Sequence, residues 1–392
     1  MRKRQLSLIE KWNLDVESYN KYGAKMSVRS PQCMSCSNRI KNEARHCVIY
    51  QQQEKPKYVL LPSKECQVYS SSSLMEVNIT NDIDERFYGG LYGACIGDIL
   101  GVPVEFTSRQ ERDIDPVQEL RAYGTYHQPF GTWSDDTSLT LCLIEAMCKD
   151  FSLEKVAKNM ISFYRQAEFT PHGEVFDIGN ATKEAIERME LGIAPSDCGG
   201  KKESDNGNGS LMRVLPLAYY GRDFEEKELV DIIEQVSSLT HGHVRSRFAC
   251  IFYVVYAIQL LEGKDKVEAY SKTIDFMNRN CQSEYEQEYE VYHRVLNKEL
   301  FHAEQKYIKS TGYVVESLEA SLWSFLNAHS FKDVVFNAVN LGGDTDTIAS
   351  IAGGLAGIYY GFKDIPNNWI QCIAKKEMLQ NLFQELYCKV EN

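Results

Sequence analysis

The most constraining feature of this sequence is a helical spacing of apolar residues that persists from Phe87 almost to the C-terminus. Seven segments carry apolar residues at positions i, i+3, i+4 and i+7, the spacing that places them on one face of an α-helix. They are RFYGGLYGACIGDILG, SLTLCLIEAMCKD, LEKVAKNMISFYRQ, IGNATKEAIERMELG, FEEKELVDIIEQVSSL, RSRFACIFYVVYAIQLLEG and LEASLWSFLNAH. No series of strand-like segments interrupts them, and Gly- and Pro-rich pieces such as GIAPSDCGGKKESDNGNGS are typical of loops. The pattern predicts an all-α main domain.

The chain divides into two parts at a run of serines, Ser70 to Ser73, which is followed by the turn-rich stretch LMEVNITNDIDE. Small polar residues of this kind are typical of linkers. We therefore expect an N-terminal extension over residues 1–80 and a helical domain over residues 81–392. Residues 1–60 hold 12 Lys and Arg against 5 Asp and Glu, a net charge of about +7, whereas the whole chain carries −12. The extension is thus a basic module attached to an acidic domain.

The N-terminal extension contains four cysteines with the spacing Cys33-x2-Cys36-x10-Cys47-x18-Cys66. Thiolates bind zinc in a tetrahedral arrangement, and a metal stabilises a segment that is too small to bury its own core. One structural Zn²⁺ bound by Cys33, Cys36, Cys47 and Cys66 is therefore one interpretation. The second pair lacks the CxxC spacing of a strong zinc signature, so ordinary reduced cysteines in a loosely folded extension are the alternative.

The composition fits a globular protein and argues against several functional classes. Of the 392 residues, 43% are hydrophobic and 25% are charged, and the net charge of −12 makes a general nucleic-acid binder unlikely. The start MRKRQLSLIEKW lacks the apolar core of a signal peptide, and we expect no membrane span because no window approaches 18 uncharged apolar residues. Twelve cysteines without a secretion signal indicate free thiols in a reducing compartment, so we expect a cytoplasmic protein.

Near the C-terminal end, the stretch NLGGDTDTIASIAGGLAG crowds Asp344, Thr345, Asp346 and Thr347 directly before an apolar helix. A single Asp there would be an ordinary helix N-cap, but two carboxylates at i and i+2 with hydroxyls beside them favour a bound cation. The helix that follows is rich in Ala and Gly, and we expect it to pack backbone-close against its neighbours. Such packing would let the acidic side chains converge with no bulky residue between them.

A second acidic segment, FGTWSDDTSLTLCLIEAM, places Ser134, Asp135 and Asp136 at the start of another apolar helix. Read alone, Ser134 is an N-cap and the two carboxylates lie favourably at the positive end of the helix dipole. The parallel with the first segment favours a metal site, because neither segment has a basic neighbour that would pair with buried carboxylates. Oxygen donors suit magnesium, calcium or manganese rather than zinc, and four carboxylates with two hydroxyls suffice for two ions.

Seven motifs in order along the chain resemble those of the ADP-ribosylglycohydrolases. They are GACIGDILGVPVEF, WSDDT, FDIGNAT, GNGSLMRVLP, LTHGH, TGYVVESLEASLW and LGGDTDTIASIAGGLAG, and the N-terminal extension lies outside them. The sequence is most similar to the arginine-directed branch, which includes the dinitrogenase-reductase-activating glycohydrolases. The resemblance implies a compact all-α fold of orthogonal helices and a binuclear centre of two Mg²⁺ or Mn²⁺ ions. It also implies hydrolysis of the bond between ADP-ribose and a protein side chain.

By motif position, the resemblance further implies which residues form the metal site and the catalytic set. The metal ligands would be Ser134, Asp135, Asp136, Asp344, Asp346 and Thr347. The family more often has Thr at the first of these positions, so Ser134 keeps the ligand oxygen and loses only a methyl group. Asp135 and Asp136 would also belong to the catalytic set, in which Glu105 lies over the metals and substrate.

The same resemblance assigns Asp177, in VFDIGN, as the acid/base near the scissile bond and Asn180 as a substrate contact. The residues themselves indicate only that Asp177 and Asn180 lie three apart, on one face of a helix, or that Asp177 caps that helix. Without the resemblance, Glu105 in VPVEF would be an unremarkable loop residue.

The remaining positions that the resemblance implies are substrate contacts: Gly207, Asn208, Gly209, Ser210, His241, Tyr313 and Gly343. The segment SDNGNGSLMRVLP is expected to open an apolar helix whose free backbone N–H groups would bind the diphosphate, although NGNG is also common in plain turns. His241 would contact ribose or phosphate, and Tyr313 would pack on the nucleotide or, alternatively, belong to the core. Arg213, on the same expected helix, is interpreted as structural.

The predicted function is metal-dependent removal of ADP-ribose from a modified protein, with ADP-ribosyl-arginine the favoured linkage. Hydrolysis of ADP-ribosylated serine, nucleic acid or a free metabolite is the alternative within enzymes. An alternative of another class is an immunity protein whose N-terminal extension binds a cognate ADP-ribosyltransferase and blocks it. A catalytically inactive relative is disfavoured, because every ligand position keeps an oxygen donor.

Overall fold

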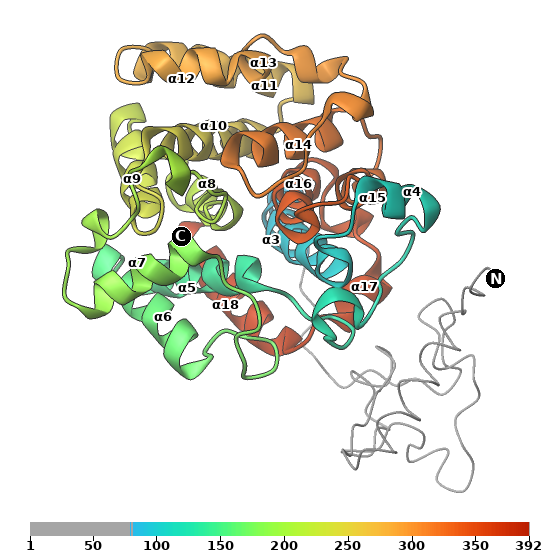
Figure 1. Cartoon of the computed structure of the whole chain (residues 1–392). Coiled ribbons are helices and arrows are strands. Elements are labelled where there is room, and N and C mark those ends of the chain that lie inside the picture. The colour runs from blue at the N-terminus through green and yellow to red at the C-terminus, as the bar shows by residue number, and fades with distance from the viewer. Residues whose placement is uncertain (1–78, 80, 392) are drawn as a thin grey trace, which may run out of the picture. The chain divides into compact units, whose positions relative to one another are not determined.

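The computed structural model describes residue 79 and residues 81–391, which form helices joined by loops and 3-10 turns (Figure 1). The α-helices are α3 (Asp82–Gly101), α4 (Arg109–Ile114), α5 (Asp135–Cys148), α6 (Leu153–Gln166), α7 (Asn180–Glu190), α8 (Pro216–Tyr220), α9 (Glu226–Ser238), α10 (Val244–Leu261), α11 (Lys266–Asn280), α12 (Glu286–Val291), α13 (His293–Leu296), α14 (Val314–Leu326), α15 (Phe331–Val339), α16 (Thr345–Tyr360), α17 (Asn367–Cys372) and α18 (Lys376–Val390). In this part of the chain no strand forms, and β-type pairing is limited to isolated bridges such as that of Gly207 with Tyr313. The predicted all-α main domain is confirmed.

The four cysteines of the predicted zinc site, Cys33, Cys36, Cys47 and Cys66, lie outside the described residues, so zinc binding stays a prediction. The division of the chain at residue 80 stays a prediction as well. All eight cysteines of the described part are free thiols, in agreement with the expected reduced state.

Helices α3 and α16 lie side by side at the centre of the helical domain (Figure 1). A Cβ atom added at Gly93 or Gly97 of α3 would collide with the backbone of α16, at Gly353 and Ala349 respectively. The converse holds for Gly357 of α16, where a Cβ atom would meet the backbone of α3. The expected backbone-close packing of the Ala- and Gly-rich helix is therefore confirmed, and its partner is a second helix with glycines every four residues.

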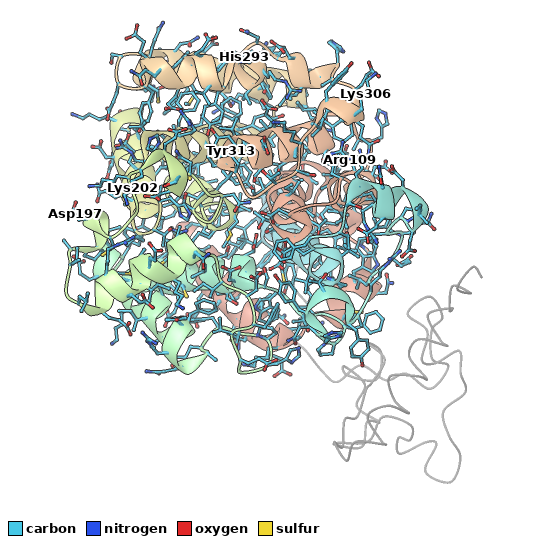
Figure 2. All side chains as sticks on the ribbon, viewed as in Figure 1. Arg109, Asp197, Lys202, His293, Lys306 and Tyr313 are labelled. Carbon is cyan, nitrogen blue, oxygen red and sulfur yellow. The ribbon has the colours of Figure 1, made fainter. Side chains whose placement is uncertain are left out.

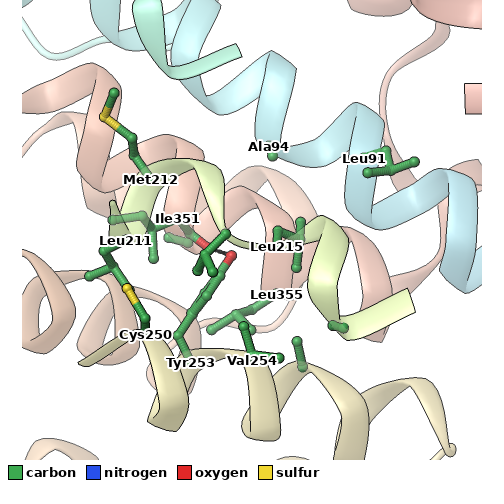
Figure 3. Close-up of a cluster of buried hydrophobic side chains, with 14 of the residues drawn as sticks. Leu91, Ala94, Leu211, Met212, Leu215, Cys250, Tyr253, Val254, Ile351 and Leu355 are labelled. Carbon is green, nitrogen blue, oxygen red and sulfur yellow. Dashed lines mark hydrogen bonds between the residues drawn. The ribbon is translucent and has the colours of Figure 1, made fainter. Parts of the chain in front are cut away.

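Further helices pack around this central pair. Helices α10, α14 and α15 contact α16, and α5 contacts α3. Figure 3 shows one apolar cluster of this core, in which Leu91 of α3, Tyr253 of α10 and Leu355 of α16 converge with Leu215, which precedes α8. The Tyr253 hydroxyl donates a hydrogen bond of 3.0 Å to the carbonyl of Ile351, so the polar end of a fully buried ring is satisfied within the core.

Outer helices follow the apolar spacing of the sequence. In α6, Ser152 is the N-cap, and its side chain accepts a hydrogen bond from the backbone N–H of Lys155. Val156, Met160 and Phe163 then recur at i, i+4 and i+7, and all three are buried. The helix therefore begins where its cap dictates and faces the core with the stripe that the sequence indicates.

Two helical stretches, Asp82–Val104 and Val244–Leu261, are long and apolar enough to cross a membrane by length and composition alone. The expectation that the chain has no membrane span stays a prediction. The most apolar 18-residue window of the first is wholly buried in the fold, and 72% of the corresponding window of the second is buried. Burial between other helices accounts for the apolar composition of both.

Candidate active site

The start of α5 holds the acidic segment of Ser134, Asp135 and Asp136. Ser134 is the N-cap as predicted, and its hydroxyl accepts a hydrogen bond of 3.2 Å from the backbone N–H of Asp136. Asp135 and Asp136 lie in the first turn, and both side chains are buried. The local capping interpretation is therefore correct, and it leaves the carboxylates themselves facing the interior of the protein.

Asp98 of α3 fixes this helix start from behind. Its fully buried carboxylate accepts hydrogen bonds from the backbone N–H of Ser134, at 2.9 Å, and from the hydroxyl of Thr137, at 2.6 Å. Burial raises the pKa of Asp98 to about 6 in spite of these bonds. The sequence interpretation did not select this residue, although an Asp inside the apolar, Gly-rich stretch ACIGDILG was a signal that could have identified it.

The start of α16 holds the acidic segment from Asp344 to Thr347, which meets the acidic segment at the start of α5. The Thr347 hydroxyl donates a hydrogen bond of 3.2 Å to Asp136 Oδ2, which joins positions 211 residues apart in the chain. Asp346 is buried, and the carboxylates of Glu105, Asp136 and Asp344 contribute to a pKa well above its usual value, after burial itself. The two acidic segments therefore lie next to each other in the structure, as predicted.

The charges of this cluster have no basic counterpart. Among the described residues, no ion pair involves Asp135, Asp136, Asp344 or Asp346. Burial, followed by neighbouring carboxylates, raises the pKa of both Asp135 and Asp136 well above the usual range. Asp136 Oδ1 is buried with no hydrogen-bond partner, and so is Oε2 of Glu105. Orphaned anionic oxygens of this kind are costly unless a cation binds them.

Glu105, Asp177 and Asp346 form the tightest acidic group, because one carboxylate oxygen of each lies within 4.8 Å of the others. Burial, together with Asp177 and Asp344, raises the pKa of Glu105 to about 8. Burial and the charge of Asp344 raise the pKa of Asp177 to about 6. The two predicted catalytic carboxyls therefore lie next to the predicted metal ligands and titrate near neutral pH.

Tyr126, in the 3-10 turn Gly124–Tyr126, is a further residue that the sequence interpretation missed. Its hydroxyl lies close to the carboxyls of Glu105 and Asp177, and its interaction with each lowers the pKa of that carboxyl against the effect of burial. Burial and the charge of Asp177 in turn raise the pKa of Tyr126, so the phenol keeps its proton and acts as the donor. The local sequence around Tyr126, RAYGTYHQ, gives no sign of this role. Only the folded loop brings the hydroxyl of Tyr126 close to the two carboxyls.

Asp177 is not part of a helix. It lies in the irregular segment before α7, which begins at Asn180, and the N-cap position belongs to Gly179, with no side-chain capping bond. The expected common helical face of Asp177 and Asn180 is therefore wrong, and so is the capping alternative for Asp177. The reason is the Gly179 backbone, at φ −62° and ψ 142°, which starts the helix after Asp177 and frees its side chain to turn towards Glu105.

The NGNGS loop adjoins the acidic cluster through Asn208. Its side-chain amide donates hydrogen bonds of 2.7 Å to Asp344 Oδ2 and 2.9 Å to the Ser317 hydroxyl. The loop also pairs with the start of α14, through the bridge of Gly207 with Tyr313. Tyr313, marked in Figure 2, is half-buried, and its hydroxyl accepts a hydrogen bond of 3.0 Å from Arg245. Predicted metal ligands and predicted nucleotide contacts therefore belong to one continuous site.

His241 lies directly behind the same loop. A Cβ atom added at Gly209 would come within 2.8 Å of the His241 ring, so only glycine leaves the ring this close to the loop backbone. Burial, with the charge of Arg213 as a second cause, lowers the pKa of His241 to about 3. The ring is therefore neutral at physiological pH and offers a hydrogen bond rather than a charge.

One expectation about this loop needs correction. The segment after Ser210 does not open a long apolar helix but forms the 3-10 turn Leu211–Arg213, followed by the short helix α8, because Pro216 at the first position of α8 interrupts the hydrogen-bond ladder. The Ser210 hydroxyl is buried and accepts a hydrogen bond of 3.0 Å from Ser237, so it faces the core.

Arg213 and Gly343 support the site without facing it. The buried Arg213 guanidinium donates hydrogen bonds to the carbonyls of Gly209 and Val236, in keeping with a structural role. Gly343 has φ +74°, and a Cβ atom there would collide with the carbonyl of Ser310. The Gly343 N–H donates a hydrogen bond of 2.8 Å to the carbonyl of Thr107, and the Gly343 carbonyl accepts one of 2.8 Å from the N–H of Phe106. Both partners lie in the loop that follows Glu105. The assigned roles of all these residues as ligands and contacts stay predictions.

The donor set fits divalent cations. It consists of carboxylate and hydroxyl oxygens only, it is buried, and two of its oxygens lack any partner. Hard oxygen ligands of this kind favour magnesium, calcium or manganese over zinc. The arrangement is therefore able to hold a metal beside two carboxyls with raised pKa values, which is the chemistry of a hydrolytic centre.

Comparisons with known proteins agree with this geometry. A sequence model of the ADP-ribosylglycohydrolase family matches residues 79–392. The chain belongs to the ADP-ribosylglycohydrolase family. Membership makes it a hydrolase of glycosidic bonds and confirms the resemblance found in the sequence.

Three relatives and solved structures illustrate the similarity. The ADP-ribosylarginine hydrolase Tri1 of Pseudomonas putida (strain GB-1) is 32% identical over 310 residues, which is 77% of this chain and 78% of that protein. The ADP-ribosyl-[dinitrogen reductase] glycohydrolase of Rhodospirillum rubrum is 27% identical, over 75% of this chain and 92% of that protein. A solved structure described as an ADP-ribosylglycohydrolase-related protein complex has a TM-score of 0.67 at 28% identity, covering 79% of this chain and 99% of that chain. This fold match agrees with the predicted helical architecture.

Replacing Asp98 by asparagine tests its role behind α5. An amide has only one acceptor oxygen and turns N–H groups towards the donors of Ser134 and Thr137, so the free energy of unfolding should fall by about 1–3 kcal/mol. The shift of α5 should also lower kcat/KM for release of ADP-ribose by about 10- to 100-fold. Urea denaturation and an ADP-ribose assay measure the two effects. Asp275→Asn, an exposed position on α11, is the matched control and should change neither quantity.

Proposed function

We propose that this chain removes ADP-ribose from modified arginine side chains of proteins, with two divalent cations, Mg²⁺ or Mn²⁺, in its acidic cluster. The observation that carries the proposal is the meeting of buried, unpaired carboxylates at the starts of α5 and α16, joined by the bond from Thr347 to Asp136. The relatives support the linkage, because two of them, from Pseudomonas putida and Serratia proteamaculans, are named ADP-ribosylarginine hydrolases, at 32% and 28% identity.

The cluster residues would hold the cations as the family position of each implies: Ser134, Asp135, Asp136, Asp344, Asp346 and Thr347. When bound, the cations would polarise ribose hydroxyl oxygens and stabilise negative charge on them. Asn208 supports this arrangement from the substrate side, because its amide fixes the orientation of Asp344. The bond places an uncharged donor between the metal ligands and the loop expected to receive the diphosphate.

Asp177 is proposed as the acid/base. A carboxylate oxygen of Asp177 lies within 4.8 Å of those of Glu105 and Asp346, so this side chain is placed beside the proposed cations, where it would give a proton to the departing nitrogen or take one from water. Tyr126 would donate its single hydroxyl proton to one of the two neighbouring carboxyls, Asp177 or Glu105. General acid–base catalysis of this kind typically contributes about 10²- to 10⁴-fold to the rate.

The test is a side-by-side assay of the purified protein on two substrates, one protein ADP-ribosylated on arginine and one on serine. We expect release of ADP-ribose from the arginine-linked substrate at a kcat/KM at least about ten times that for the serine-linked substrate. An Asp177→Asn variant is the matched control, since it removes the proton transfer and keeps the shape of the side chain. Release from the serine-linked substrate alone would overturn the proposed linkage.

Removal of divalent cations tests the metal dependence. After dialysis against EDTA we expect ADP-ribose release to cease and to return when MgCl₂ or MnCl₂ is added. Because the cations bind only the folded cluster, saturation to 100 times Kd should raise the free energy of unfolding by about 2.7 kcal/mol for each independent site, and by about 5.4 kcal/mol for two. Denaturation with and without metal measures this, with NaCl at equal ionic strength as the control for simple screening. Full activity in EDTA would contradict the proposal.

A further inference from the structure

Phe106 is an exposed aromatic residue that immediately follows Glu105 in the chain. Its side chain is 71% exposed, and its backbone lies in the left-handed region at φ +61°. A bulky residue in that region is a conformational outlier, and solvent exposure means that core packing does not explain the position of the ring. Phe106 therefore combines two costs, a strained backbone and an exposed phenyl group, at one position next to a catalytic carboxyl.

Phe106 belongs to a row of three rings. Its centroid lies 6.4 Å from that of Tyr126, and the Tyr126 centroid lies 5.1 Å from that of Phe176. The outer rings directly adjoin the two acidic residues in sequence, Phe106 after Glu105 and Phe176 before Asp177. The central ring carries a hydroxyl that lies close to both carboxyls. We call Phe106, Tyr126 and Phe176 the aromatic row.

The backbone that presents the aromatic row is strained at both loops and is held by the site itself. Tyr123 and His127, on either side of the turn that carries Tyr126, have φ values of +67° and +54°. The Phe106 N–H donates a hydrogen bond of 2.8 Å to the carbonyl of Gly343, the residue before Asp344. Backbone strain of this kind is kept only where the surroundings enforce it, and it gathers at ligand-binding positions.

We propose that the aromatic row is the binding site for the target arginine, with Phe106 and Tyr126 stacking against its guanidinium group. This proposal rests on the proposed arginine linkage. A guanidinium is planar, delocalised and weakly hydrated, so it stacks on aromatic rings where a hydroxyl-linked side chain does not. The acidic side chains of Glu105 and Asp177 adjoin the outer rings in sequence, so oxygen acceptors for the N–H groups of a guanidinium lie nearby. Phe106 is thereby a specificity residue that selects the amino acid to which ADP-ribose is attached.

The test compares Phe106→Gly with Phe106→Tyr on arginine-linked and serine-linked ADP-ribosylated protein. Glycine accepts the left-handed backbone without strain, so this variant removes the ring and keeps the fold. We expect Phe106→Gly to lower kcat/KM for the arginine-linked substrate by about ten-fold, chiefly through KM, and Phe106→Tyr to stay within about two-fold of the unmodified protein. The inhibition constant of free ADP-ribose should not change, because that ligand has no guanidinium. Ile114→Ala, an exposed apolar position at the end of α4, is the control.

Two results would overturn the inference. One is an unchanged kcat/KM for Phe106→Gly on the arginine-linked substrate. The other is an equal loss of affinity for free ADP-ribose, which would assign the ring to the nucleotide. Failure of the proposed function has a different signature, because the unmodified protein itself would then release no ADP-ribose from the arginine-linked substrate. That result would contradict the proposed function and the arginine-binding role of the aromatic row together.

Discussion

Replacing Asp346 by alanine is expected to abolish release of ADP-ribose while the metal-free protein stays as stable as the unmodified one, or becomes more stable. Asp346 is the carboxylate common to the metal set and to the tight group with Glu105 and Asp177. Stabilisation of developing charge by a bound cation is worth several kcal/mol, so the loss of its ligand should lower kcat by at least about 1,000-fold.

The expected stability of the metal-free Asp346→Ala protein follows from the repulsion between Asp346 and the neighbouring carboxylates. Burial and the charges of Glu105 and Asp136 raise the pKa of Asp346 well above its usual value, which means that its ionised form is unfavourable in the folded, metal-free protein. Removing it relieves that cost, at the expense of a small cavity. Groups that destabilise the fold in order to build a site are the usual origin of a trade-off between stability and activity.

The measurement is an ADP-ribose assay combined with urea denaturation in EDTA and in MgCl₂. The unmodified protein should gain stability in MgCl₂, and Asp346→Ala should gain much less. Asp150→Ala is the control, because this side chain is fully exposed after α5 and its ion pair with Lys155, at 3.7 Å, contributes little. Release at the unmodified rate by purified Asp346→Ala would count against the metal cluster.

The parts of the site that depend on local sequence could be predicted, and those made by tertiary packing could not. Ser134 as N-cap and the two carboxylates after it follow from helix-capping chemistry within three residues. The meeting of Asp136 with Thr347, far apart in the chain, had no local signal and rested on the parallel between two acidic segments and on family resemblance.

Asp98 and Tyr126 show what sequence reasoning missed. Asp98 acts through the backbone of another helix, and Tyr126 reaches Glu105 and Asp177 only through a turn with positive φ values at both ends. Neither contact has a characteristic spacing. A buried charge in an apolar helix is nevertheless a usable signal, since such a group must find partners elsewhere in the fold.

The wrong expectations share one cause, the use of helical periodicity across glycine- and proline-containing segments. Gly179 starts α7 only after Asp177, and Pro216 separates the 3-10 turn after Ser210 from α8. In both segments, a glycine or proline determines where the helix begins. The spacing of the apolar residues around it does not indicate that position. The zinc site of the N-terminal extension and its role in blocking a partner stay predictions, which deletion of residues 1–80 and metal analysis would test.

Replacing Gly97 by alanine is expected to destabilise the protein by about 3 kcal/mol, although the same change in an open helix stabilises by about 1 kcal/mol. A Cβ atom at this position of α3 would meet the carbonyl group of Ala349 and the backbone N of Ser350, both within α16. Backbone atoms cannot turn aside as a flexible side chain does, so the two central helices must separate.

The separation should also reach the active site. Gly97 adjoins Asp98, which holds the start of α5, and Ala349 lies one turn after Asp346. We therefore expect kcat to fall together with the free energy of unfolding, whereas Phe106→Gly should change KM and leave stability alone. Gly97→Val should be worse still and fail to accumulate as folded protein, because a loss beyond about 4–5 kcal/mol consumes much of a typical domain's stability.

Urea denaturation of Gly97→Ala against Gly179→Ala measures the effect with a matched pair. At Gly179, the N-cap of α7, φ is −62° and an added Cβ atom would meet only the Thr182 hydroxyl, at 4.0 Å, so alanine there should cost no more than about 1 kcal/mol, through its poorer capping. The larger loss expected at Gly97 separates the effect of helix contact from local backbone preferences. If Gly97→Ala were as stable as the unmodified protein, α3 and α16 would not be in backbone contact, and the shared support of the two acidic segments would be lost with it.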